Sequence, residues 1–330
     1  MQATDGATTG DAAAVPAPAD AAHIHDVQDI VVGVDGSEES VDAVAWALRE
    51  AERRDVSVRA VLAWRPSSNA AEIYQRATFG STRQLEDMLL SNVQHTVTEA
   101  VDRTGLSDVA ISTRFAHGHP VQELTDAAGA VSLLVVGSRG RGALTGTVMG
   151  STSQGCVQYA RGPVVVVRGP VRNQDVGAAV VVGVDGSRSS IVAERFAAHA
   201  ATVRSGVLYV VHGWLYNAAD LAESLWPRAH PVLAGEAETV LADSVSRIAA
   251  DFPGLDVRPH LVRTLDHTYL LDAAVGASLL VVGSRGHGGF PGMLLGSVSL
   301  RCITQATCPV AVIHSPAAAH HDNAPHPTRA

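Results

Sequence analysis

The 330-residue sequence contains no lysine, because all 24 of its basic residues are arginine. A Walker-type phosphate loop, a Schiff-base lysine and a lysine general base are therefore excluded. Aromatic residues are also scarce, at 4%, so aliphatic side chains must fill the cores. The formal net charge is −9. Proteins that bind nucleic acids or anionic membranes need a basic surface, so we expect neither as a partner.

Long hydrophobic runs are missing too, since no apolar stretch approaches the roughly 20 residues of a membrane-spanning helix. The three cysteines, Cys156, Cys302 and Cys308, make an odd number and lack metal-ligand spacing. This pattern favours free thiols in a reducing cytoplasm, and it assigns no metal site. Residues 1–28 and 315–330 are rich in alanine, proline and polar side chains, and we expect disordered tails there rather than targeting signals.

What the chain does contain is an internal repeat. The segment Ile-Val-Val-Gly-Val-Asp-Gly-Ser at residues 30–37 returns with one change at 180–187, and Leu-Leu-Val-Val-Gly-Ser-Arg-Gly at 133–140 returns unchanged at 279–286. This period is far longer than the roughly 20–50 residues of a solenoid repeat, so it predicts two tandem domains. We place the domains at residues 29–168 and 178–314, with a linker at 169–177.

Each copy alternates aliphatic runs of strand length with helical patterns. The runs of the first copy lie at residues 30–34, 58–63, 109–115, 133–136 and 164–167. They are unbroken, which is typical of parallel strands buried on both faces. The helical patterns lie at residues 40–54, 82–103, 121–130 and 151–160. We therefore predict an α/β fold in which each domain is a doubly wound, Rossmann-like sheet of five parallel strands.

Both copies carry the same glycine pattern after the fourth strand. Gly-Ser-Arg-Gly at residues 137–140 is followed by Gly-Ser at 150–151, and the same residues recur at 283–286 and 296–297, so both copies fit Gly-x2-Gly-x9-Gly-Ser. Glycines let backbone amides approach phosphate oxygens, and a helix beginning at Gly-Ser attracts anions. The pattern predicts a phosphate-binding loop at the switch point of each sheet. The alternative is that the glycines only shape a tight strand-to-helix loop.

With these motifs the sequence resembles the universal stress protein family, in particular the tandem-domain, ATP-binding type common in actinobacteria. Val-Gly-Val-Asp-Gly-Ser after the first strand and Val-Val-Gly-Ser-Arg-Gly after the fourth are features of that family. The Gly-x2-Gly-x9-Gly-Ser pattern separates its ATP-binding members from the others. The resemblance covers both predicted domains and implies a strand order of 3-2-1-4-5. It also implies ATP as the ligand, with Mg²⁺ left open as an accompanying ion.

By position, the resemblance assigns one nucleotide site to each domain. The glycine loop and the Gly-Ser pair would hold the phosphates on their backbone amides, Gly137 would meet the ribose, and Asp35 with the ends of the first two strands would line the adenosine end. The first site comprises Gly33, Asp35, Ala63, Gly137, Ser138, Arg139, Gly140, Arg141, Gly142, Gly150 and Ser151. The second comprises Gly183, Asp185, Gly213, Gly283, Ser284, Arg285, Gly286, His287, Gly288, Gly296 and Ser297.

Some of these side chains have two roles open to them. Asp35, like its counterpart in the second copy, can accept hydrogen bonds from a ligand hydroxyl or hold its own Gly-Ser turn. Arg139 and its counterpart can offset phosphate charge or point into solvent. Where Arg141 is replaced by His287, the local charge depends on pH, so we expect the second site to be the weaker one.

We expect a binding module in which ATP occupancy of each domain regulates a still unidentified partner protein or stress tolerance. A slow Mg²⁺-dependent ATPase is the enzymatic alternative, although no catalytic residue is assigned and only Asp35 and Asp185 could approach the phosphates. A nucleotide-free assembly module is the other alternative. The fifth strand, at residues 164–167, lies at a sheet edge that needs covering. The resemblance implies that the two copies pair through these edges, and we expect homodimers of the tandem chain.

Overall fold

The computed structural model describes residues 27–65, 82–140, 149–169, 178–215, 229–264, 268–286 and 295–315. Most of the two expected tails and of the expected linker lie outside these ranges. The first half contains β1 Asp29–Gly33, α1 Glu38–Arg54, β2 Ser57–Trp64, α3 Thr82–Thr104, β3 Ile111–His117, α4 Pro120–Ala128, β4 Leu133–Gly137, α5 Ser151–Tyr159 and β5 Val164–Val167. The second contains β6 Val180–Gly183, α6 Arg188–Val203, β7 Leu208–Leu215, α8 Ala229–Asp251, β8 Val257–Thr264, α9 Tyr269–Ala273, β9 Leu279–Gly283, α10 Ser297–Gln305 and β10 Val310–Ile313.

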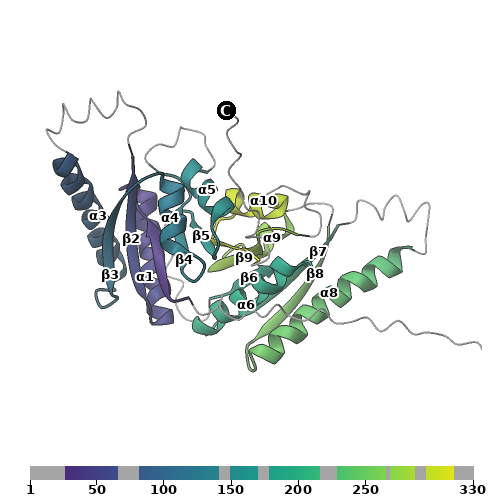
Figure 1. The fold of residues 1–330 in the computed structure, drawn as a ribbon. Coiled ribbons are helices and arrows are strands. Elements are labelled where there is room, and N and C mark those ends of the chain that lie inside the picture. The colour runs from purple at the N-terminus through teal and green to yellow at the C-terminus, as the bar shows by residue number, and fades with distance from the viewer. Residues whose placement is uncertain are drawn as a thin grey trace, which may run out of the picture.

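All these strands belong to one ten-stranded sheet, ordered β3-β2-β1-β4-β5-β10-β9-β6-β7-β8. Within each half the order is 3-2-1-4-5 and neighbouring strands are parallel, which confirms the predicted fold. The halves meet through β5 and β10, which pair antiparallel with Val165 opposite Ala311. The expected pairing of the two copies through their fifth strands is thus confirmed. Figure 1 shows the halves side by side, with α3 and α8 at opposite ends.

Two elements differ from their expected positions. The chain bends at Asp108 and Val109, so β3 begins at Ile111 rather than at the first apolar residue of its run. It is an edge strand whose side chains are mostly exposed or half-buried, and the aliphatic pattern is correspondingly weak. In the first half, a Gly-x-Pro turn at Gly118-His119-Pro120 leads into α4, whereas the second copy has Thr-Leu-Asp at 264–266 in the sequence. Helix α9 is only five residues long, against nine for α4.

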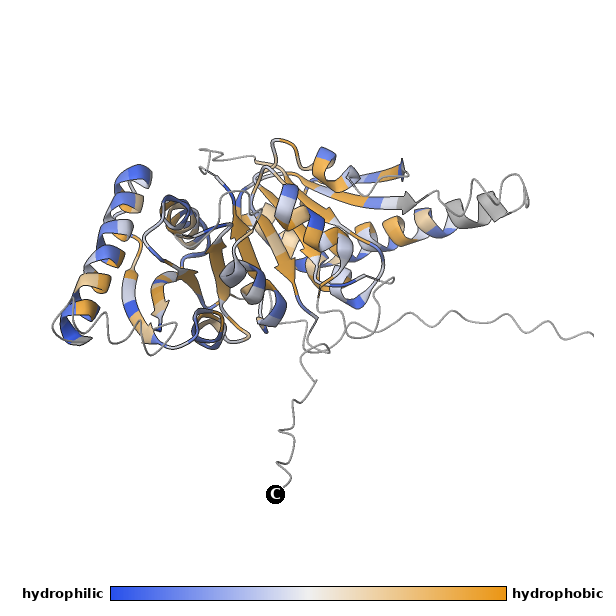
Figure 2. Cartoon of the chain, turned by 90° about the horizontal axis from the view of Figure 1, so that it is seen from above, coloured by the Kyte–Doolittle hydropathy of each residue, from blue (hydrophilic) through white to orange (hydrophobic). Residues whose placement is uncertain are grey.

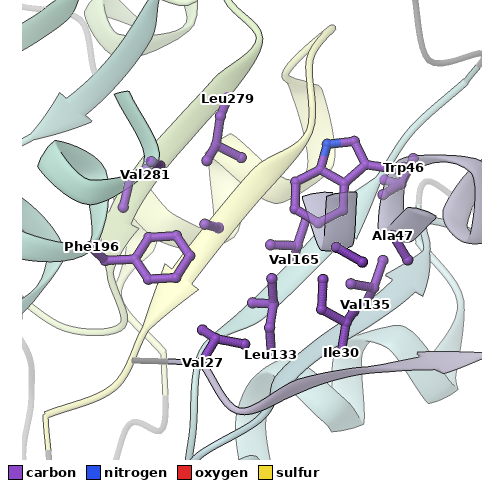
Figure 3. Packing of buried hydrophobic residues seen from close by; sticks show 14 of the residues in the cluster. Val27, Ile30, Trp46, Ala47, Leu133, Val135, Val165, Phe196, Leu279 and Val281 are labelled. Carbon is purple, nitrogen blue, oxygen red and sulfur yellow. The ribbon is translucent and has the colours of Figure 1, made fainter. Parts of the chain in front are cut away.

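The aliphatic runs fill two cores, one on each face of the sheet. Helices α1, α3, α6 and α8 cover one core, and α4, α5, α9 and α10 cover the other. Both cores cross from one half to the other, because the side chains of β5 and β10 alternate between them. Figure 2 shows the apolar strands enclosed by helices with polar outer surfaces. In Figure 3, Trp46 of α1 and Phe196 of α6 lie in the same cluster as Val165.

Candidate functional site

A cavity of about 320 Å³ opens at the carboxyl edge of the first half of the sheet, around the ends of β1 and β4. The strand order reverses between these neighbours, and ligands of doubly wound folds bind at such switch points. The cavity lies at the small end of the ~300–1,000 Å³ range of small-molecule sites. Its lining residues are Gly33, Val34, Asp35, Ser40, Val61, Ala63, Pro120, Leu124, Val136, Gly137, Arg139, Gly140, Met149, Gly150, Ser151, Thr152 and Ser153.

One wall is the turn that joins β1 to α1. Gly36 adopts a φ of 77°, in the left-handed region that favours glycine. The turn lets Oδ1 of Asp35 accept hydrogen bonds from the N–H and the hydroxyl of Ser37, at 3.0 and 2.6 Å. The Ser37 hydroxyl oxygen accepts a bond from the N–H of Ser40 at 3.2 Å and caps α1. Asp35 therefore does hold its own Gly-Ser turn.

The glycine loop after β4 approaches this turn closely. A Cβ on Gly140 would collide with Oδ2 of Asp35, so any side chain at this position would displace that carboxylate. The second half repeats it, since a Cβ on Gly286 would collide with Oδ2 of Asp185. Oδ1 of Asp185 accepts a hydrogen bond from the N–H of Ser187 at 2.9 Å. Two motifs that lie far apart in the sequence therefore meet in each half.

The N-terminus of α5 forms a third wall. Gly150 is its N-cap, and the Gly150 N–H donates to the carbonyl of Ser138 at 2.8 Å. That amide is therefore already used within the fold. The N–H groups of residues 151–153 have no acceptor inside the helix, and these residues line the cavity at the positive end of the helix dipole. This wall can attract an anion.

The second half builds the same strand-to-helix connection. The Gly296 N–H donates to the carbonyl of Ser284 at 2.8 Å. In both halves, the third residue of the helix donates its hydroxyl to the glycine carbonyl that ends the preceding strand, at 2.5 Å in the first half and 2.6 Å in the second. Ser138 and Ser284 are each 1% exposed, and Ser138 is not among the residues that line the cavity. These two serines connect strand and helix through their backbones.

The two site arginines lie beside the start of the first helix in each half. Arg139 lines the cavity, and its Nε lies 3.6 Å from Oε1 of Glu39. The carbonyl of Arg285 accepts hydrogen bonds from the hydroxyls of Ser187 and Ser189. The remaining loop positions expected in the sites, Arg141, Gly142, His287 and Gly288, lie outside the described residues.

The end of the second strand differs between the halves. Ala63 lines the first cavity, whereas its counterpart, Gly213, is covered by the ring of Tyr269, with which a Cβ would collide. Burial raises the pKa of Tyr269 to about 12, and nearby Cys302 and Asp185 add to this effect. A partly buried phenol ring therefore occupies, in the second half, part of the space that is open in the first.

Sequence reasoning missed part of the cavity lining. Pro120 and Leu124 of α4, together with Met149, line the cavity and add apolar surface to it. Leu124 packs against the end of β1, where a Cβ on Gly33 would lie 3.0 Å from its Cδ1. The Gly-x-Pro turn that begins α4 was the available signal, because it places this helix beside the carboxyl ends of the strands.

The described lining residues of the cavity include one acid, Asp35, and one base, Arg139. Across the described ranges, no group of three or more His, Cys, Asp or Glu is arranged to hold a metal ion. Within the same ranges, no helix combines the length and apolar character needed to cross a membrane. Cys156 and Cys302 are buried, and burial raises the pKa of each thiol to about 12. Both thiols therefore stay protonated near neutral pH, which is typical of structural rather than reactive cysteines.

Comparison with known proteins agrees with this architecture. The model of the universal stress protein family matches residues 27–168 and 178–314. A universal stress protein of Mycobacterium tuberculosis is 35% identical over 305 residues, covering 87% of this chain and 95% of the relative. One from Mycolicibacterium smegmatis is 35% identical over 290 residues, covering 86% of this chain and 96% of its own. The chain therefore belongs to the universal stress protein family.

The fold agrees with a solved structure as well. The crystal structure of a universal stress protein from Archaeoglobus fulgidus superposes with a TM-score of 0.60, at 19% sequence identity. The match covers 88% of this chain and 98% of the other. At this identity the likeness supports the shared tandem α/β fold.

Proposed function

We propose that this chain is a nucleotide-binding regulator that holds ATP in the cavity of the first half and a second, more weakly bound ATP in the equivalent region of the second half. One observation carries the proposal: the N-terminus of α5, the Gly140–Asp35 contact and an apolar wall converge on one cavity. A polar, anion-attracting end joined to an apolar end suits a molecule with a phosphate tail and a base.

The residues divide between the two ends of such a ligand. The N–H groups of residues 151–153 and the hydroxyl of Ser151 suit the phosphates, and Arg139 adds the one positive charge among the described lining residues. The phosphate contact expected from the Gly150 amide passes to these neighbours, because Gly150 is bonded to Ser138. Ala63 and Leu124 suit the base. Occupancy would alter the surface around the cavity, through which a partner protein could sense the ligand.

The test is to denature the purified full-length protein, identify any released nucleotide and determine its amount per chain. ATP titration of wild type and of a Gly140→Ala variant then locates the site, because a Cβ there collides with Asp35. Gly235→Ala in α8 is the matched control, since a Cβ at that position meets nothing within 4 Å. No released adenine nucleotide and no ATP binding by wild type would reject the proposal in favour of a nucleotide-free assembly module.

A slow ATPase is the second candidate, because Asp35 is a carboxylate placed in the cavity. Mg²⁺ would find one protein ligand there and would take its others from phosphate oxygens and water, as it commonly does. Oδ1 of Asp35 is engaged by Ser37, and Oδ2 faces Gly140. Sustained phosphate release by wild type, lost in Asp35→Asn at unchanged ATP affinity, would favour this candidate.

We further propose a homodimer of tandem chains in a reducing cytoplasm. All three cysteines are free and buried, which suits a reducing compartment. Since β5 and β10 cover each other within the chain, a dimer needs another surface, and the outer strands β3 and β8 are the ends of the described sheet. Light scattering on the purified chain measures its mass directly, and a monomer would reject the dimer.

A further inference from the structure

A second cavity, of about 360 Å³, lies between the two halves. It sits where β5 ends and β10 begins, outside the antiparallel pair that joins the halves. The first half contributes residues of α1 and the two residues that follow β5. The second half contributes the end of α6 and the loops that precede β9 and β10. None of these residues belongs to the site described above.

The charge of this cavity is strongly one-sided. Arg49, Arg53, Arg168 and Arg204 line it, and none of its described lining residues is acidic. Three of these arginines come from the first half of the chain and Arg204 from the second. In a chain with a net charge of −9, the described lining of this cavity therefore carries four positive side chains and no negative one.

A buried carboxylate, Glu50, is shared among several guanidinium groups of the described residues. Glu50 is fully buried, and its Oε2 lies 2.5 Å from Arg204 and 3.9 Å from Arg53. Its Oε1 lies 2.6 Å from Arg54, whose NH2 is buried without a hydrogen-bond partner. The single negative charge of Glu50 is therefore shared by three guanidinium groups, those of Arg53, Arg54 and Arg204. This cluster has a net charge of +2.

Burial makes this excess costly. The side chain of Arg204 is 1% exposed and that of Arg53 is 18% exposed. Burial lowers the pKa of Arg204 and of Arg168, and in Arg168 the charge of Arg139 adds to the effect. Guanidinium groups nevertheless stay protonated in proteins, and buried ions destabilise a fold by several kcal/mol unless opposite charge compensates them. An anion in the cavity would supply that charge.

We propose that this interdomain cavity binds a multivalent oxyanion of the phosphate class, held by Arg49, Arg53 and Arg168 from the first half, against a wall from the second half that includes the buried charge of Arg204. The planar fork of arginine matches phosphate oxygens two at a time, and such charge-assisted bonds are stronger than neutral ones. Because residues of both halves line the cavity, a ligand bound there stabilises the interface between them. This site is separate from the nucleotide sites and does not depend on them.

The first measurement uses the full-length protein and sodium pyrophosphate, titrated calorimetrically at constant ionic strength. Two variants separate the sites. Gly140→Ala/Gly286→Ala alters the proposed nucleotide sites, and we expect it to keep pyrophosphate binding. Arg49→Gln/Arg53→Gln alters the interdomain cavity, and we expect it to weaken pyrophosphate binding by about tenfold or more while ATP binding is kept. Arg114→Gln/Arg161→Gln removes the same charge from exposed positions and is the control.

Thr307→Glu gives a second test that does not remove any arginine. Thr307 lines the cavity and is exposed, so a carboxylate there is tolerated and takes the place of the anion. We expect this variant to have a higher Tm without ligand and to lose pyrophosphate binding. The proposal is overturned if Thr307→Glu or Arg49→Gln/Arg53→Gln binds pyrophosphate as well as the control. It is also overturned if binding disappears in Gly140→Ala/Gly286→Ala.

The anion can be free in solution or can be the phosphate tail of a nucleotide. Titrating ADP and pyrophosphate into Gly140→Ala/Gly286→Ala distinguishes these sources. If ADP and pyrophosphate bind this variant with equal affinity, the cavity accepts the phosphate tail of a nucleotide. If ADP binds more weakly than pyrophosphate, the cavity binds a free oxyanion. Either result supports the oxyanion site. Absence of ATP binding to wild type, with pyrophosphate binding retained, would reject the proposed nucleotide function and leave this inference standing.

Discussion

Glu50 is a fully buried carboxylate that pairs with Arg54 within α1 and joins this helix to the end of α6 through Arg204. Removing one member of a buried ion pair leaves its partners uncompensated. We expect Glu50→Gln to lower the free energy of unfolding by about 3–5 kcal/mol, measured by urea denaturation at pH 7. Glu99→Gln breaks an exposed pair with Arg103, so its cost should stay below about 1 kcal/mol. Equal losses in the two variants would contradict the role of Glu50.

The same carboxylate predicts a pH dependence. Burial alone would raise the pKa of Glu50, but Arg204 and Arg54 outweigh burial and lower it from 4.5 to about 2. Its stabilisation is therefore fully present above pH 4.5 and is lost as the pH falls towards 2, in total about 3 kcal/mol. Urea unfolding at pH 7 and pH 3 should show wild type losing more stability than Glu50→Gln. Parallel losses would exclude Glu50 as a source of the acid sensitivity.

Tyr269 makes the second proposed nucleotide site different from the first. Its ring lies on Gly213, in space that is open beside Ala63 in the first half. We expect Tyr269→Ala, in a Gly140→Ala background, to raise the ATP affinity of the second site while lowering stability by about 2–4 kcal/mol. ATP titration measures the affinity. Tyr159→Ala, at a position 61% exposed, is the control. A lower ATP affinity after Tyr269→Ala would show that the ring contributes to binding instead.

At the residue scale, the sequence predicts the backbone of the site better than its side chains. The glycine spacing singles out Gly140 and Gly286, and the structure brings each of them close to the aspartate of its own half. The ring of Tyr269 over Gly213 could not be predicted, since the two residues lie on different elements and neither belongs to a motif that pairs them. The interdomain cavity could not be predicted from the sequence for the same reason, because Arg204 and Arg53 come together only when the two halves pair.

At the scale of elements, the turn before each first helix links stability to the site. The hydroxyl oxygen of Ser37 accepts the N–H of Ser40 and caps α1, and Ser187 does the same for α6. We expect Ser37→Ala and Ser187→Ala each to cost about 1 kcal/mol of unfolding free energy, measured by urea denaturation. Ser57→Ala, at an exposed strand position, should cost far less. A negligible loss in both cap variants would mean that the caps do not hold these helices.

The elements that the sequence predicts well are the ones buried on two faces. The unbroken aliphatic runs at residues 133–136 and 164–167 predict strands, and β4 and β5 lie there. The edge strand β3 begins two residues later than expected, because an exposed strand lacks that signal. The sequence before α9 has no Gly-x-Pro, and α9 is four residues shorter than α4.

At the scale of the whole molecule, the repeat predicts two domains, and a sheet edge of four valines predicts that something must cover it. The structure shows that β10 covers it, giving one sheet and two cores that cross the boundary between the halves. Composition alone could not settle this, since an exposed edge pairs equally well with another chain. The antiparallel register, with Val164 opposite Val312, puts like side chains on like faces.

These shared cores determine how the chain should unfold. A protein of 330 residues would ordinarily unfold domain by domain, because two-state behaviour is typical below about 150 residues. Here unfolding one half would expose the valines of the other, so we expect one transition with coincident midpoints by tryptophan fluorescence and far-ultraviolet circular dichroism. Arg204→Ala removes the interdomain partner of Glu50 and should separate the two midpoints, whereas Arg195→Ala, whose partner Asp251 lies in the same half, should not. Two well-separated transitions in wild type would mean that the halves are energetically independent despite their common sheet.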